Sequence, residues 1–307
     1  MFPLKGGPGS FPARLLAGTV MWRPLFSLLL FFCLVSCHPL APARLISTEI
    51  SANELWSGRI EIDGDVVIAE NASVRIAPGT QIVFLPPSEG KDRLTDHPHF
   101  VGSELIVRGR LLAEGTAAAP ITFRALDPAA PAGSWGAINL VQSAGSRFTH
   151  CRFTQADSAL HSQEADVEVA CSTFSRNLVG VRFHSSRIKV TDNIFHNNGT
   201  AIRFHFGAPV IEGNLLTEND KGLFVTSFPR DYRISGNAII ASREFQVVLG
   251  EEVPEDLQLL GNYWGSADPK EIRSHFFDGQ ETDYLGIVRF EPFLSTPPPA
   301  PETTCKP

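Results

Sequence analysis

The chain has 307 residues, 43% apolar and 19% charged, which allows a large folded domain and argues against wholesale disorder. Its net charge of −7 disfavours general nucleic-acid binding, which calls for a basic surface. The 22 Phe against 2 Met, with Gly and Pro spread along the chain, favour strands and turns over long helices.

The N-terminal region carries a predicted export signal. Arg23 precedes an apolar run over residues 25–35 that is too short to span a bilayer comfortably. The preceding residues 1–20 add nothing to this layout, so Met21 is an alternative start of translation. We predict a signal peptide over residues 1–36. Its removal takes away three positive charges and leaves a net charge of about −10.

Residues 34–37, Leu-Val-Ser-Cys, resemble the lipobox of bacterial lipoproteins at all four positions. The resemblance implies cleavage before Cys37 and acylation of its thiol, which would tether a folded domain to a membrane. His38 stands where that family uses Asp for inner-membrane retention, which implies the outer membrane. We expect residues 37–54 to be the lipidated tether. An ordinary signal peptide ending near a cysteine is the alternative.

The middle of the chain repeats with a period of 21 residues. The phrase Gly-Val-Arg-Phe-His at 180–184 returns as Ala-Ile-Arg-Phe-His at 201–205, and Phe153, Phe174 and Phe195 keep the same step. A fixed period of this length indicates a solenoid. Short alternating stretches split by Asn, Gly or Ser predict three strands per turn and no helix, hence an all-β, single-stranded, right-handed parallel β-helix.

Asparagines recur at one turn of this repeat. Stacked side-chain amides can hydrogen-bond along the axis and satisfy buried turn groups, so we predict a structural ladder. Its members are Asn193, Asn214, Asn237 and Asn262.

Outside the regular repeat the pattern of short strands separated by turns continues less regularly. Short strands are predicted at 60–62, 66–68, 74–76, 82–84, 105–107 and 121–123, with a loop inserted in one coil at 86–103. Asp268 and Pro269 predict the start of a capping helix over 269–277. The β-helix is expected over 55–295, followed by a disordered Pro-rich tail over 296–307.

The first and last coils carry further motifs: Ile-Ala-Pro-Gly-Thr-Gln-Ile-Val-Phe at 76–84, Trp-Gly-Ala-Ile at 135–138 and Gly-Asn-Tyr-Trp-Gly at 261–265. They resemble the opening and closing coils of bacterial right-handed β-helix (pectin-lyase-like) surface proteins, and the resemblance covers residues 56–294. It implies the fold and leaves the function open, because this fold serves lyases, hydrolases, esterases, copper-delivery proteins and passive rods.

A basic patch is predicted on one outer face. Alternation along the strands points Val181 and Phe183 inward, and therefore Arg182 and His184 outward. Stacking extends these positions into the rows His161-Arg182-Arg203-Phe224 and Gln163-His184-His205-Thr226. Because like charges one coil apart repel, we predict a ligand-binding face for an anionic polysaccharide. Its candidate residues are Arg182, His184, Arg203, His205 and Phe224; a merely solvated face is the alternative.

The cysteines leave two alternatives open. Cys151 and Cys171 are one coil apart, so either a disulfide between them or two buried free thiols fits an exported protein. Cys305 lies in the tail with no evident mate.

The function predicted from these features is that of a lipid-anchored envelope protein with a flat, non-catalytic carbohydrate-binding surface. The first alternative is a polysaccharide lyase or glycoside hydrolase of the same fold, although the outward rows carry no stacked Asp pair. The second is periplasmic copper handling, disfavoured because both Met residues precede the cleavage point. No metal, cofactor or nucleic-acid partner is expected, and no catalytic residue can be named.

Overall fold

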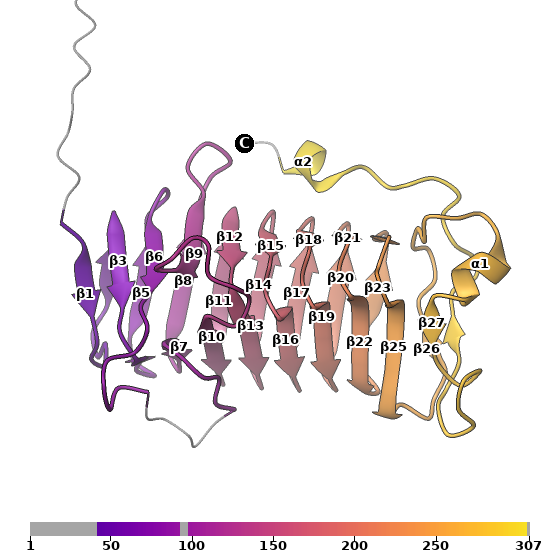
Figure 1. Cartoon of the computed structure of the whole chain (residues 1–307), viewed down its shortest axis with the longest axis horizontal. Coiled ribbons are helices and arrows are strands. Elements are labelled where there is room, and N and C mark those ends of the chain that lie inside the picture. The colour runs from indigo at the N-terminus through magenta and orange to yellow at the C-terminus, as the bar shows by residue number, and fades with distance from the viewer. Residues whose placement is uncertain (1–41, 93–97, 306–307) are drawn as a thin grey trace, which may run out of the picture. The chain divides into compact units, whose positions relative to one another are not determined.

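The strands of this protein stack as successive coils of a parallel β-helix (Figure 1). The computed structural model describes residues 42–92 and 98–305. The predicted signal peptide over 1–36 and Cys37 lie outside these residues. Within them the chain visits three sheets in a fixed order, and each strand pairs in parallel with its equivalent in the next coil.

The strands of the described residues belong to three large sheets and one small one. The first sheet contains β1 (Arg44–Ile46), β3 (Arg59–Ile62), β6 (Gln81–Phe84), β9 (Ile121–Ala125), β12 (Cys151–Thr154), β15 (Thr173–Ser175), β18 (Ile194–His196), β21 (Leu215–Thr217) and β24 (Ala238–Ile240). The second sheet contains β4 (Asp65–Ile68), β7 (Glu104–Val107), β10 (Trp135–Val141), β13 (Ala156–Gln163), β16 (Val179–His184), β19 (Thr200–His205), β22 (Lys221–Ser227), β25 (Phe245–Glu252) and β27 (Phe276–Phe277). The third sheet contains β2 (Glu54–Trp56), β5 (Ser73–Ile76), β8 (Arg110–Glu114), β11 (Ala144–Thr149), β14 (Asp166–Ala170), β17 (Arg187–Thr191), β20 (Ala208–Glu212) and β23 (Arg233–Ser235). The small sheet pairs β26 (Leu257–Gln258) with β28 (Val288–Arg289).

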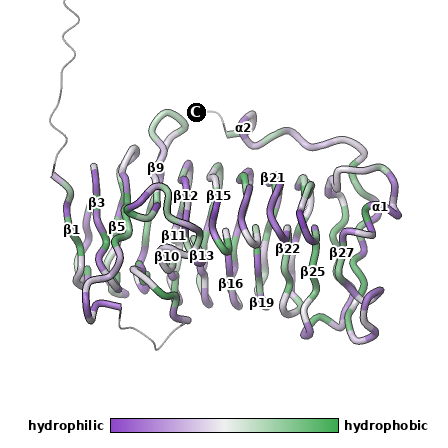
Figure 2. Tube along the Cα trace, in the orientation of Figure 1, coloured by the Kyte–Doolittle hydropathy of each residue, from purple (hydrophilic) through white to green (hydrophobic). Residues whose placement is uncertain are grey.

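Alternation along each strand decides which side chains fill the interior. In β17, Ile188 and Val190 are buried while Arg187 and Lys189 are exposed. Figure 2 shows hydrophobic and hydrophilic residues alternating along the coils. Because every coil is narrow, one line of inward residues per strand supplies the whole core.

Identical inward residues stack into continuous files. The rings of Phe123, Phe153, Phe174 and Phe195 lie face to face, with centroids 4.7, 4.6 and 4.7 Å apart. These separations equal the spacing of neighbouring strands. Each ring therefore covers the next, and the column is held by burial between coils rather than within one coil.

Two asparagine ladders hold the turns. Asn193, Asn214, Asn237 and Asn262 are joined by amide-to-amide hydrogen bonds of 2.9–3.0 Å. A second ladder of Asn177, Asn198 and Asn219 does the same at another corner. Each side-chain oxygen also accepts from the backbone amide one coil earlier, so buried turn groups are paired through the neighbouring coil.

The column begins before the predicted boundary at residue 55. β1 and the start of β2 fall within the segment expected to be a tether, and Ile46 and Ile50 are buried. Ile50 also bridges to Ile68 of β4. These apolar side chains complete the first coil, which explains why this segment is ordered.

The C-terminal cap starts as predicted and ends earlier. α1 (Pro269–Arg273) is capped by the Asp268 carboxylate, which accepts from the Lys270 amide at 2.9 Å. The predicted helix to residue 277 is wrong over its last part, because Phe276 and Phe277 form β27 and pair with β25. Phe276 is buried edge-on against Trp264, with centroids 4.9 Å apart, so burial at the end of the column outweighs another helical turn.

The tail over 296–305 is ordered, in contrast to the expected disorder. It runs back along the coils and ends in α2 (Pro301–Thr304) (Figure 1). Pro301 is buried, and the Thr304 hydroxyl donates to the Asp192 carboxylate at 3.0 Å. A disulfide between Cys171 and Cys305 fixes its end.

The alternative of a Cys151–Cys171 disulfide is wrong. Cys151 points into the column, where it is a buried free thiol next to the carbonyl of Ala113. Burial raises the pKa of this thiol. Cys171 lies at a turn with φ of +51° and its sulfur faces the tail instead. The direction of each side chain, rather than the coil separation, selects the pairing.

None of the helices among the described residues is long and apolar enough to cross a bilayer.

We expect Asn198→Ala to destabilise the fold by about 1–3 kcal/mol, because it removes the acceptor of the buried Asn177 backbone amide and the side-chain donor to the Phe174 carbonyl. It also takes one hydrogen bond from each neighbouring ladder side chain. Chemical denaturation followed by circular dichroism measures this change. Arg152→Ala, which truncates an exposed side chain on the same sheet, is the control and should change stability by less than about 0.5 kcal/mol. Equal stability of the two variants would contradict the role of the ladder.

Peptide mapping of the oxidised protein should recover one linked pair, Cys171 with Cys305, and a Cys151 thiol that reacts only after unfolding. Removing the bond with Cys305→Ser should cost about 2–5 kcal/mol in unfolding free energy. Cys151→Ser leaves the bond intact and is the control for the mapping. A Cys151–Cys171 peptide would contradict the structure.

Candidate binding groove

Two outward rows of side chains run side by side over the second sheet. In the first row His161 pairs with Arg182, Arg182 with Arg203, and Arg203 with Phe224. In the second row Gln163 pairs with His184 and His184 with His205. We call Arg182, His184, Arg203 and His205 the basic face.

The last rung of the second row departs from the predicted alignment. A bulge in the β19–β22 pairing shifts the register between Phe204 and His205, so His205 pairs with Ser227 rather than Thr226. Thr226 still reaches the row, because its hydroxyl lies 3.4 Å from Nδ1 of His205.

Residues 98–100, near the end of the inserted loop, form a wall beside the basic face. Pro98 is fixed by the side-chain amide of Asn139, which donates to its carbonyl at 3.0 Å. Phe100 is buried edge-on against the His161 ring, with centroids 5.2 Å apart. The guanidinium of Arg182 lies 5.5 Å from the centre of the Phe100 ring. The loop therefore covers the start of the first row and leaves the later rungs open.

The predicted flat surface is wrong, because this wall turns the face into an open groove of about 570 Å³. The groove is lined by three loop residues (Pro98, His99, Phe100) and by residues of both rows and the strand positions between them (His161, Gln163, Arg182, Phe183, His184, Arg203, Phe204, His205, Thr226). His161 is itself buried, with its Nδ1 2.7 Å from the Asn139 side chain, so it supports the wall rather than facing solvent.

The two arginines of the basic face are partly desolvated. Burial lowers the pKa of both guanidinium groups. The pKa of Arg182 is lowered further by Arg203, with Asp157 acting in the opposite direction. Arg203 lies 4.9 Å from the centre of the Phe224 ring, so each arginine rests on an aromatic face.

This arrangement differs from that of other arginines on the column. Arg147, Arg187 and Arg233 each pair with a carboxylate one coil away, at 3.0, 2.5 and 2.5 Å. Among the described residues, Arg182 and Arg203 form no ion pair. Two positive charges in consecutive coils therefore remain available to an anion in the groove.

The histidines of the basic face stack. The rings of His184 and His205 lie 5.0 Å apart and nearly parallel, and His205 Nε2 is 3.6 Å from the Glu252 carboxylate. In the described structure, Nδ1 of His184 and Oε1 of Gln163 are buried without a hydrogen-bond partner. Both residues line the groove, and these two atoms retain unmet hydrogen-bonding capacity there.

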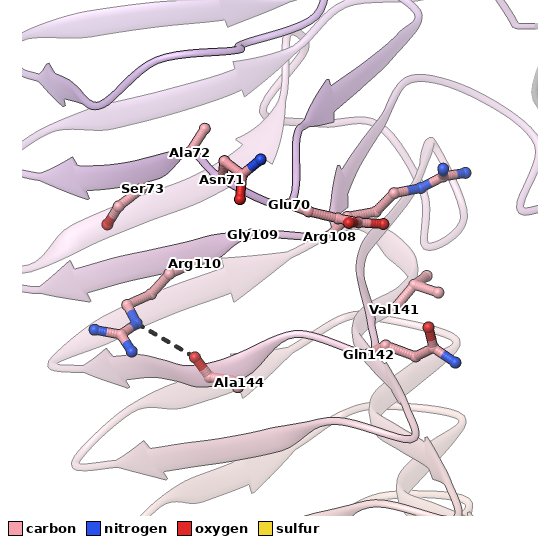
Figure 3. A pocket seen from close by; sticks show the side chains of 10 residues that line it. All are labelled: Glu70, Asn71, Ala72, Ser73, Arg108, Gly109, Arg110, Val141, Gln142 and Ala144. Atoms are coloured by element: carbon pink, nitrogen blue, oxygen red, sulfur yellow. Dashed lines mark hydrogen bonds between the residues drawn. The ribbon is translucent and has the colours of Figure 1, made fainter.

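A second open hollow of about 660 Å³ lies at the corner between the second and third sheets (Figure 3). It is lined by residues from three coils, among them Glu70, Arg108 and Gln142. Arg110 extends to one side of it and donates to the carbonyl of Ala144 at 3.3 Å. Its lining lacks the aromatic side chains that accompany the guanidinium groups of the groove.

Phe100 and its loop are the part of the groove that sequence reasoning missed. The repeat predicts where each strand residue lies on the column, but it does not predict the path of an inserted loop. The sequence therefore did not show which face this loop covers. The signal that could have indicated it was the position of the insertion, directly before β7 and one coil before β10, together with the aromatic Phe100 near its end.

A buried carboxyl lies near the base of the inserted loop. Glu104 is fully buried, and desolvation, followed by the nearby Asp65 carboxylate, raises its pKa to about 9. A carboxyl whose folded pKa exceeds its unfolded value of 4.5 stabilises the fold below the unfolded pKa. This contribution is lost as the pH rises toward 9.

Glu104→Gln should therefore be about as stable as the wild type at pH 5 and more stable at pH 8–9, because the amide cannot ionise. At pH 8–9 we expect Glu104→Gln to melt at a higher temperature than the wild type, by about 2–4 °C for each kcal/mol gained in unfolding free energy. Calorimetry measures this difference. Exposed Glu70→Gln serves as the control and should show no such divergence. Parallel pH profiles for wild type and Glu104→Gln would contradict the raised pKa.

Comparison with known proteins supports the fold. Residues 133–239 match the family model described as a right-handed β-helix region. No curated protein and no solved structure gives a significant match. The match covers the regular coils that carry the basic face, and the parallel pairing extends the same architecture on both sides of it. The chain therefore contains a right-handed parallel β-helix.

Proposed function

We propose that this protein binds an acidic carbohydrate chain in the groove without transforming it. The observation that carries the proposal is the pair of partly buried guanidinium groups, Arg182 and Arg203, with no carboxylate partner among the described residues. Arginine forms paired hydrogen bonds with carboxylate and sulfate groups, and desolvation strengthens them. On a chain of net charge −7, two such groups in one groove favour an anion.

The coil spacing favours a ligand that is itself repetitive. The rings stacked beneath and beside the groove are 4.9–5.0 Å apart from coil to coil, so Arg182 and Arg203 repeat at a similar step. A polymer with one acid group per unit can satisfy both. The rings of His184 and His205 line the groove and offer contacts to the apolar faces of sugar rings. Phe224, a predicted ligand-binding residue, is not among the lining residues and instead lies against Arg203.

The lining of the groove favours binding over hydrolysis. None of its described lining residues carries a carboxyl group, whereas glycoside hydrolysis generally uses two carboxyl groups across the bond. A polysaccharide lyase or hydrolase remains the alternative that the binding experiment distinguishes by product formation.

The proposal includes the location of the protein. The lipobox-like residues 34–37 follow a short apolar run, which supports export and acylation at Cys37. Anchoring at the outer membrane would place the groove among envelope or extracellular polysaccharides.

Isothermal titration calorimetry with three tetrasaccharides tests the proposal: tetragalacturonate, a sulfated heparin tetrasaccharide, and neutral cellotetraose. We expect one or both acidic ligands to bind and cellotetraose not to bind. The double variant Arg182→Ala, Arg203→Ala should weaken acidic binding by at least about a hundredfold, because each desolvated charge pair contributes several kcal/mol.

Arg152→Ala, Lys189→Ala removes the same charge from exposed positions on the other two sheets and is the matched control. It should leave the affinity within about twofold. Failure of both acidic ligands to bind, or equal losses in the two double variants, would reject the groove as their site. Release of unsaturated or reducing ends during the titration would favour the enzymatic alternative.

A further inference from the structure

The turn after β19 carries an exposed aromatic residue in an unfavourable backbone conformation. Phe206 has φ of +54°, and 39% of its surface is exposed. Left-handed backbone geometry is disfavoured for bulky side chains and is normally taken by Gly, Asn or Asp. Core phenylalanines such as Phe195 and Phe204 are almost fully buried, so packing inside the column does not account for the exposed part of the Phe206 ring.

The equivalent turn in earlier coils shows what the geometry alone requires. Gln142, Glu164 and Ser185 hold this position after β10, β13 and β16, with φ of +51°, +49° and +51°. All three are polar. The turn therefore forms without an aromatic ring in the three preceding coils, and Phe206 departs from them. In the next coil Phe228 follows Ser227, the partner of His205, but it does not have the left-handed backbone of Phe206.

The position of the ring places it at the rim of the groove. Phe206 lies edge-on to His205, with centroids 4.7 Å apart and planes at 82°. His205 lines the groove and stacks on His184. Phe206 thus continues the aromatic surface of the second row around the corner from the second sheet toward the third.

We infer that Phe206 is an aromatic platform that stacks on a sugar ring at the rim of the groove. This inference rests on the proposed function and specifies its ligand. While Arg182 and Arg203 hold acid groups inside the groove, Phe206 contacts a neighbouring sugar unit of the same chain. The ligand is then an acidic oligosaccharide or polysaccharide rather than a single sugar acid. Residues with an unfavourable backbone conformation are often kept at binding sites, where their function outweighs the cost in stability. Phe206 has both the unfavourable conformation and the exposure that such a role requires.

Phe206→Asn separates a binding role from a structural one, because Asn suits the left-handed conformation and removes the ring. We expect its affinity for the acidic tetrasaccharide that binds the wild type to fall about three- to tenfold, as for loss of one aromatic stacking contact. Its melting temperature should be equal to or above that of the wild type. Binding of galacturonate monomer or of a sulfated monosaccharide, matched to the tetrasaccharide used, should be unchanged.

Two further variants complete the test. Phe206→Trp keeps a ring and should retain the affinity within about twofold. Ser185→Asn changes the equivalent turn one coil earlier and should leave both affinity and stability unchanged. The inference is overturned if Phe206→Asn binds the tetrasaccharide as the wild type does, or if tetrasaccharide and monosaccharide lose affinity equally. If the wild type binds no acidic ligand, both the proposed function and this inference are rejected. If the wild type binds an acidic ligand and Phe206→Asn binds it equally well, only the inference is rejected.

Discussion

Parallel hydrogen bonding between consecutive coils fixes the position of every side chain relative to its equivalent one coil away. The step of about 4.8 Å is set by the backbone and cannot be adjusted by side chains. Aromatic rings inside therefore meet face to face, and turn asparagines meet amide to amide. The same constraint acts outside, where it brings Arg182 directly beside Arg203.

Inside and outside, this constraint has opposite energetic consequences. Stacked Phe174 and Phe195 gain burial and ring contact, so repetition there stabilises the column. Burial lowers the pKa of both stacked guanidinium groups, and repulsion from Arg203 lowers the pKa of Arg182 further. Elsewhere on the column the repulsion is avoided by acid partners such as Asp166 for Arg187. Over the groove the two arginines lie against Phe100 and Phe224 and form no ion pair among the described residues, although the Asp157 carboxylate partly offsets the repulsion at Arg182. This arrangement suits an anionic ligand.

Departures from the repeat carry the rest of the architecture. The inserted loop before β7 creates the wall, the bulge at β22 shifts the last rung, and Phe206 replaces a polar turn residue. At the C-terminus, α1 and β27 close the column, while the tail returns five coils to reach Cys171. The regular coils supply a rigid scaffold, and the departures from the repeat shape the groove over the second sheet and add aromatic side chains to its edges.

The sequence by itself determined the column, its three strands per coil and the partners of the stacked residues in the regular coils. A 21-residue period leaves one register in which Phe153, Phe174 and Phe195 share an interior. The bulge that pairs His205 with Ser227 was not predicted. It also placed Arg182 and His184 outward, since alternation is a local property of strands. Only the tertiary structure decided what lies over that face, how far the C-terminal helix extends, and which cysteine meets Cys305. These features depend on contacts between segments that the period does not relate. Phe100 of the inserted loop packs on His161 of β13, and Phe276 fills the end of the column. The tail brings Cys305 to Cys171, which lies 134 residues earlier in the sequence.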